Sequence, residues 1–123
     1  MLKQTLTYVD YNNVERTEDF YFNLTQAEVT EMELSITGGL VEKINRIVAA
    51  QDGGEIMKLF KDMILKAYGE KSPEGKHFLK SEERSLLFSQ TEAYNDLFMR
   101  LVTNPEAAAA FVNGILPQAP KPN

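Results

Sequence analysis

The spacing of apolar side chains changes once along this chain, at Thr25, and that change constrains the fold more than any other feature. Before Thr25, apolar residues occupy every second position in two short runs, which is the pattern of β-strands that bury one face. The runs flank Asp10–Asn13, whose Asp and Asn residues tolerate left-handed turn conformations. We therefore expect an antiparallel β-hairpin over residues 2–24, with one face on a core and a polar face in water.

From Thr25 onward the apolar residues follow a helical period. The clearest stripe runs from Ile56 to Tyr68, where apolar residues recur at i, i+3, i+4 and i+7. Gly38 and Gly39 separate two earlier helical stretches, since glycine permits a sharp reversal of the chain. Sequence patterns typical of helix starts occur at Thr25–Glu28, Asp52–Glu55, Ser89–Glu92 and Asn104–Pro105.

These patterns together predict one domain over residues 1–116. Its fold class is α+β and mostly helical, with an N-terminal antiparallel β-hairpin followed by about five or six packed α-helices over residues 25–116. His77–Lys80 is expected to be a short extended or irregular piece after a turn. Residues 117–123 contain three prolines and are expected to form a flexible tail.

Composition excludes several classes of function. The chain has no cysteine, so it can form no disulfide, thiolate nucleophile or Cys-ligated metal site. Its formal net charge is −5 and its lysines and arginines are scattered, which argues against nucleic-acid binding. No apolar run reaches the roughly 20 residues of a membrane span, and no secretory signal is visible at the N-terminus. We expect a cytoplasmic protein without cofactors.

Catalytic and metal-binding residues are not expected. The single histidine, His77, has no serine in a nucleophile-elbow pattern to work with. Carboxylates are frequent, but Glu28, Glu55 and Glu92 occupy helix-capping positions, and Glu82 suits the positive end of a helix dipole. No cluster has the spacing of a metal site. The sequence therefore predicts a protein that is not an enzyme.

Two apolar residues are left over once the helix faces are assigned. Leu65 falls nearly opposite the centre of the Ile56–Tyr68 stripe, and Met99 falls outside the apolar face of the helix that follows Ser89. A flexible, polarisable methionine on an exposed face suits an adaptable protein-binding surface. Leu65 and Met99 are thus candidate protein-binding residues, with self-association or cover by a further layer of helices as the alternatives.

Eight short sequences follow one another along the chain: Tyr8–Asn12, Glu18–Thr25, Ala27–Glu28, Ala67–Ser72, Phe78–Ser81, Ala93–Tyr94, Leu97–Met99 and Phe111–Pro117. In this order they resemble small proteins encoded in the tail-morphogenesis region of long-tailed bacteriophages and prophages, the tail assembly chaperones. The resemblance spans nearly the whole chain, and its motifs are structural rather than catalytic.

The resemblance implies a non-enzymatic role during tail building in the cytoplasm of the bacterial host. Such chaperones coat the long, helical, aggregation-prone tape-measure protein, help recruit tail-tube subunits around it, and are not expected in the finished virion. In many of these phages a longer form arises by ribosomal frameshifting. A compact acidic helical domain can stay soluble while it offers apolar grooves to an amphipathic helix.

Two other classes of protein remain open from the sequence. A structural tail or connector subunit would form a ring through the edge of the hairpin. An acidic inhibitor that mimics nucleic acid would need a continuous acidic face, whereas the acidic residues here alternate with lysines along the helices.

Overall fold

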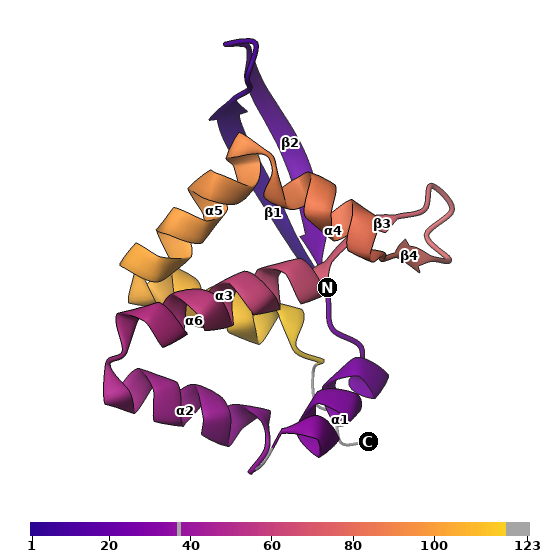
Figure 1. Cartoon of the computed structure of the whole chain (residues 1–123). Coiled ribbons are helices and arrows are strands. Elements are labelled where there is room, and N and C mark those ends of the chain that lie inside the picture. The colour runs from indigo at the N-terminus through magenta and orange to yellow at the C-terminus, as the bar shows by residue number, and fades with distance from the viewer. Residues whose placement is uncertain (37, 118–123) are drawn as a thin grey trace.

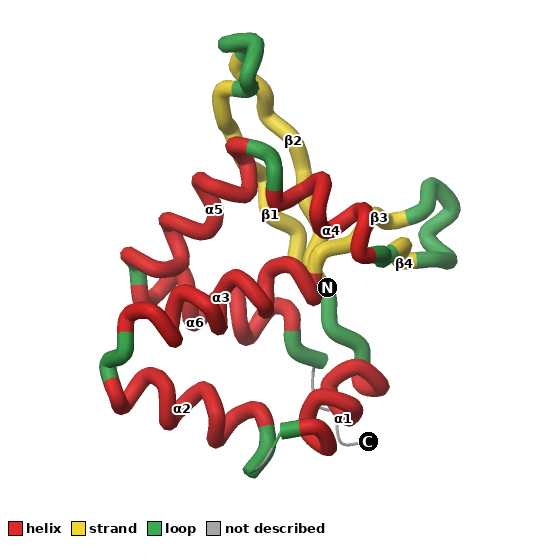
Figure 2. Tube along the Cα trace, viewed as in Figure 1, coloured by secondary structure: helices red, strands yellow, loops and turns green. Residues whose placement is uncertain are grey.

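The computed structural model describes residues 1–36 and 38–117, without the side chains of residues 41 and 48. Within these residues, a four-stranded sheet and six helices form the fold (Figures 1 and 2). The elements are β1 (Leu2–Val9), β2 (Glu15–Phe22), α1 (Gln26–Ser35), α2 (Leu40–Ala50), α3 (Gly53–Ala67), β3 (Tyr68–Lys71), β4 (Phe78–Leu79), α4 (Glu82–Ser89), α5 (Glu92–Thr103) and α6 (Pro105–Ile115). The mostly helical α+β class is confirmed, while the predicted tail lies outside the described residues from position 118 onward.

The predicted hairpin is present, and its turn is held by one carboxylate. Strands β1 and β2 pair antiparallel without a bulge, from Leu2 opposite Phe22 to Val9 opposite Glu15. In the turn, the Asp10 carboxylate accepts hydrogen bonds from the backbone N–H groups of Asn12 at 2.8 Å and Val14 at 3.0 Å. Asn13 takes the left-handed conformation with φ of 60°. These contacts fix the turn, and the apolar face also specifies the register, because a slip of one residue would turn that face toward water.

The two faces of the hairpin are as the alternation predicts. On the wet face, Thr5 donates a hydrogen bond to Asp19 at 2.6 Å, and the hydroxyls of Thr7 and Thr17 lie 2.9 Å apart. On the covered face, Leu6 is buried and Phe22 is fully buried. Cross-strand pairs of this kind stabilise a sheet that has only one face in contact with a core.

The sheet has two strands beyond the predicted hairpin, and one of them, β4, lies in the segment His77–Lys80 that the sequence predicts to be extended or irregular. Tyr68, expected in a helix, begins β3, which pairs antiparallel with β2 through Tyr21 opposite Gly69 and Phe22 opposite Tyr68. Tyr68 leaves the helix because its ring stacks on Phe88 of α4, with ring centroids 4.2 Å apart. The local spacing of apolar residues does not reveal this stabilisation of the strand, since Phe22 and Phe88, the partners of Tyr68, lie far from it in the chain.

Most of the predicted helix starts are confirmed. Thr25 and Glu28 form a reciprocal capping box, Asp52 accepts a hydrogen bond from the N–H of Glu55, and Asn104 caps α6. The predicted cap at Ser89 is wrong. Ser89 is the last residue of α4, and Thr91 caps α5 by accepting a hydrogen bond from the N–H of Tyr94 at 3.1 Å. The side-chain oxygen of an N-cap residue can reach the backbone N–H of the third residue after it. Thr91, two residues after Ser89, is placed in this way relative to Tyr94.

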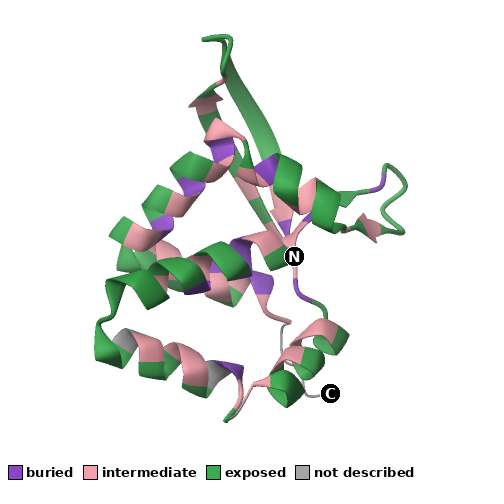
Figure 3. Cartoon of the chain, in the orientation of Figure 1, coloured by how far each residue is buried: buried purple, intermediate pink, exposed green. Residues whose placement is uncertain are grey.

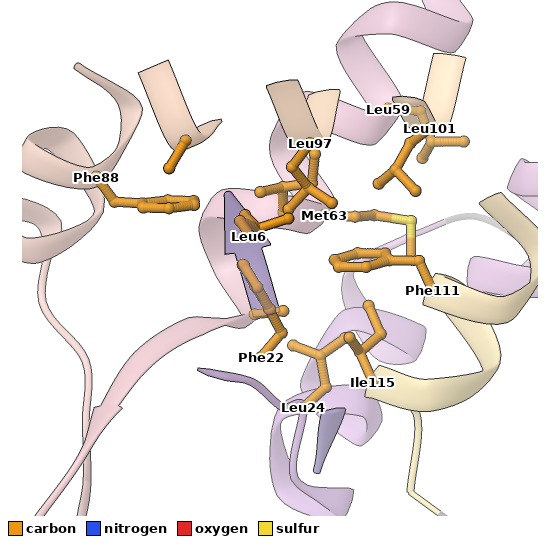
Figure 4. Close-up of a cluster of buried hydrophobic side chains, with 13 residues drawn as sticks. Leu6, Phe22, Leu24, Leu59, Met63, Phe88, Leu97, Leu101, Phe111 and Ile115 are labelled. Carbon is orange, nitrogen blue, oxygen red and sulfur yellow. The ribbon is translucent and has the colours of Figure 1, made fainter. Parts of the chain in front are cut away.

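The core lies between the sheet and α3, α5 and α6 (Figure 4). Phe22 of β2 and Phe111 of α6 meet edge to face at its centre, with ring centroids 5.4 Å apart. Beyond the end of β2, the Leu24 N–H donates a hydrogen bond to the carbonyl of Ile115 at 2.9 Å. The core cluster contains Leu6, Phe22, Leu24, Leu59, Met63, Ile64, Ala67, Phe88, Ala93, Leu97, Leu101, Phe111 and Ile115. The two ends of the described chain therefore share one core.

Candidate protein-binding groove

An apolar groove of about 480 Å³ opens between four helices at the end of the molecule away from the hairpin turn. Each of these helices contributes to its wall, α2 with a single residue and α6 with the most. The described residues that line it are Ile44, Ile56, Phe60, Leu101, Val102, Pro105, Ala108, Ala109, Val112 and Asn113. None of these residues carries a formal charge, so the groove offers a wall suited to apolar side chains.

The amino-acid sequence builds this groove through the small side chains of α6. Ala108 and Ala109 face the groove beside Val112, so this part of α6 projects only methyl groups between the neighbouring helices. On the opposite wall, Ile56 and Phe60 of α3 are four residues apart and therefore share a helix face. Phe60 belongs to the predicted apolar stripe from Ile56 to Tyr68, and it is only partly buried because it lines the groove.

Met99 and Leu65 do not lie in the groove wall. Met99 is 46 % exposed, in agreement with its predicted position off the apolar face of α5. Leu65 is partly buried and packs against the core cluster, which agrees with the alternative of cover by further helices. Helix α4 covers this face of α3, and the Ser85 hydroxyl donates a hydrogen bond to the Leu65 carbonyl at 2.9 Å.

We expect glutamate to act differently at these two positions. Leu65→Glu should lower the free energy of unfolding by about 1–3 kcal/mol, since it moves a charge into a partly buried contact with α4. Met99→Glu should change the same quantity by no more than about 0.5 kcal/mol, because the side chain is already in water. Urea unfolding of both variants measures this contrast. Equal losses of stability in the two variants would show that Met99 is covered as well.

The other sequence candidates lie elsewhere. His77 is exposed in the loop between β3 and β4, where its N–H donates a hydrogen bond to the Ser72 hydroxyl oxygen at 3.0 Å. A second hollow of about 230 Å³ lies beside the sheet, and Glu18, Asp19, Glu70 and Lys71 contribute to its mixed wall. Across residues 1–36 and 38–117, no group of three or more acidic or histidine side chains is arranged to hold a metal ion.

None of the helices in the described part of the chain combines the length and the apolar character needed to cross a bilayer.

Sequence reasoning missed the groove because its residues come from four helices. The signal that could have found it is the run Ala107–Ala110, which is too small to fill the space beside a helix, followed by Val112 on the same side. That signal becomes useful only when the neighbours of α6 are known. Leu65 and Met99, the candidate residues from the sequence, do not line the groove and so do not indicate where it is.

Comparison with known proteins yields one match. The family model described as phage tail assembly chaperone matches residues 1–120, nearly the whole chain. No curated protein and no solved structure is similar enough to the chain to count as a match.

Proposed function

Because the chain belongs to the phage tail assembly chaperone family, we propose that it binds the tape-measure protein and helps recruit tail-tube subunits around it. It acts without catalysis, in the cytoplasm of the bacterial host, and leaves before the virion is complete. The single observation that carries the binding step is the uncharged groove between α2, α3, α5 and α6.

The groove suits a helical client on physical grounds. A long helical protein with exposed apolar stripes aggregates unless those stripes are covered, and an uncharged groove between helices accepts the apolar face of an amphipathic helix. The formal net charge of −5 keeps the complex of chaperone and client soluble by repulsion between copies. Met99, exposed on α5, provides a second apolar contact outside the groove.

Co-expression with the tape-measure protein from the same phage tests this proposal. A tagged copy of the chain should keep the tape-measure protein in the soluble fraction and elute with it, whereas tape-measure protein expressed alone should pellet. An unrelated acidic helical domain of similar size serves as the control for a general effect of co-expression. The proposal fails if the tape-measure protein pellets equally with and without the chain.

Purified particles separate this role from that of a tail or connector subunit. A chaperone should be absent from finished particles, as judged by mass spectrometry of the purified virion. Its presence there in a fixed number of copies per tail would contradict the proposal and favour the structural subunit.

A further inference from the structure

Helices α1 and α2 lie at the edge of the core, and we call this pair the flap. Val29 and Met32 of α1 and Ile44 and Ile47 of α2 are partly buried against the core cluster. The flap lies at the end of the molecule opposite the hairpin turn, and it is mostly exposed or partly buried (Figures 1 and 3). None of the α1 residues is buried. Leu40 of α2 is only 3 % exposed, yet it is not part of the core cluster. Segments with few contacts to the main core open locally at a lower free energy than the whole domain.

Backbone geometry gives the flap its bends. Gly38 and Gly39 precede α2 with φ values of 83° and 87°, and Gln51 follows it with φ of 52°. Within the flap, the Leu40 N–H donates a hydrogen bond to the Glu33 carboxylate at 3.0 Å, which ties α2 to α1. One hydrogen bond thus joins the start of α2 to α1, and turns in the left-handed region lie at each end of α2.

Lys80 holds the flap to the rest of the molecule. Its ammonium group donates hydrogen bonds to the Asn23 carbonyl at 2.6 Å and to both carboxylate oxygens of Glu28, at 2.8 and 3.0 Å. Burial alone would raise the pKa of Glu28, but the hydrogen bonds from Lys80 and Thr25 outweigh it and lower that pKa. This contact joins α1 to the segment after β4.

Helix α2 packs on α3 beside the groove, and its sequence indicates which kind of helix this surface binds. Its apolar side chains Leu40, Ile44 and Ile47 recur at i, i+4 and i+7, so they lie on one face. Ile44 and Ile47 pack against the core cluster, Ile44 lines the groove, and the main contact of α2 is with α3. The surface of α3 and α6 is therefore already occupied by an amphipathic helix at one edge.

We propose that the flap opens as a unit and that an incoming amphipathic helix, with apolar residues at i, i+4 and i+7, takes the place of α2 against α3 and α6. This inference deepens the proposed function and rests on it for the identity of the natural client. Opening widens the groove, and the client selects the open state, so its apparent affinity rises in proportion to the open fraction.

Release of the Lys80 contact tests the proposal. Lys80→Met keeps an unbranched side chain one heavy atom shorter than lysine, and it removes the hydrogen bonds to Asn23 and Glu28. Loss of such partly exposed charged hydrogen bonds corresponds to roughly a tenfold change in an equilibrium. Hydrogen exchange of backbone amides in α1 and α2 should therefore become about tenfold faster, while exchange in α5 and α6 stays unchanged. Arg84→Met is the matched control, since it removes an exposed 2.8 Å ion pair with Glu70 that does not touch the flap.

A peptide measures replacement of α2 without any phage partner. A fluorescent peptide with the sequence of residues 40–50 should bind the Lys80→Met chain about tenfold more tightly than the parent chain or Arg84→Met, by anisotropy. A scrambled peptide of the same composition should bind none of them. Exchange of α2 amides only through global unfolding, or equal or undetectable peptide binding by all three chains, would overturn the inference. Failure of the parent chain to bind tape-measure protein would instead count against the proposed function alone.

Discussion

Phe111→Ala is expected to lower the free energy of unfolding by about 3–5 kcal/mol, the cost of removing a fully enclosed aromatic side chain. The Phe111 ring is 1 % exposed and meets Phe22 edge to face. Its loss leaves a cavity where α6 packs against β2. This cavity cannot collapse without displacing the backbone hydrogen bond between the Leu24 N–H and the Ile115 carbonyl. Urea unfolding followed by far-UV circular dichroism measures the change.

Phe98→Ala provides the comparison within the same fold. Phe98 stacks on Tyr94 with ring centroids 5.9 Å apart, but it is only partly buried. We expect its loss to cost about 1–2 kcal/mol, since less apolar area leaves water on folding. If the two variants lost the same small amount of stability, α6 would not be part of the core.

Ala109→Glu is expected to weaken capture of the tape-measure protein at least about 30-fold, because a charge in an apolar groove must be desolvated when a client helix enters. Ala109 is exposed, lines the groove and lies on α6, where glutamate is a good helix former. The melting temperature of the free protein should therefore stay close to that of the parent. Pull-down of co-expressed tape-measure protein, quantified against input, gives the measurement.

Ala110→Glu is the matched control for this effect. It is the next residue on the same helix, is also exposed, and is not among the residues that line the groove. The same charge is thus added to the same helix about 100° away. Capture by the Ala110→Glu variant should equal that of the parent chain, and equal loss in both variants would indicate a general effect of negative charge.

The hairpin and most helices could be predicted from the sequence because their signals are local. Alternation before Thr25 and the capping residues Asp52 and Asn104 each act within a few residues of the element that they define. A side chain two or three positions away is enough to satisfy a helix start. Such patterns depend little on the rest of the molecule.

Strand β3 could not be predicted because its stabilisation comes from distant residues. Tyr68 continues the apolar stripe of α3 in sequence, but its pairing with Phe22 and its stack on Phe88 favour an extended backbone. Leu65 shows the same limitation. The position of Leu65 opposite the stripe does not predict its contact with α4. Helix α4 reaches Leu65 only after the chain has turned back through β3 and β4.

The groove depends on long-range packing in the same way. Its walls come from four helices, and the small residues Ala108 and Ala109 become meaningful only beside Phe60 and Val102. Met99 could be placed on an exposed face from helical period alone, because that placement requires only the position of its own helix. Its part in binding stays a prediction.

The backbone hydrogen bond between Leu24 and Ile115 has a consequence for folding during synthesis on the ribosome. The N-terminal hairpin is made first, yet its apolar face finds Phe111 and Ile115 only after roughly 90 further residues have been added. At typical rates of synthesis this takes about 5–20 s. Throughout that interval Phe22 and Leu24 lack their partners on α6, so this part of the core closes only when the last helix has been made.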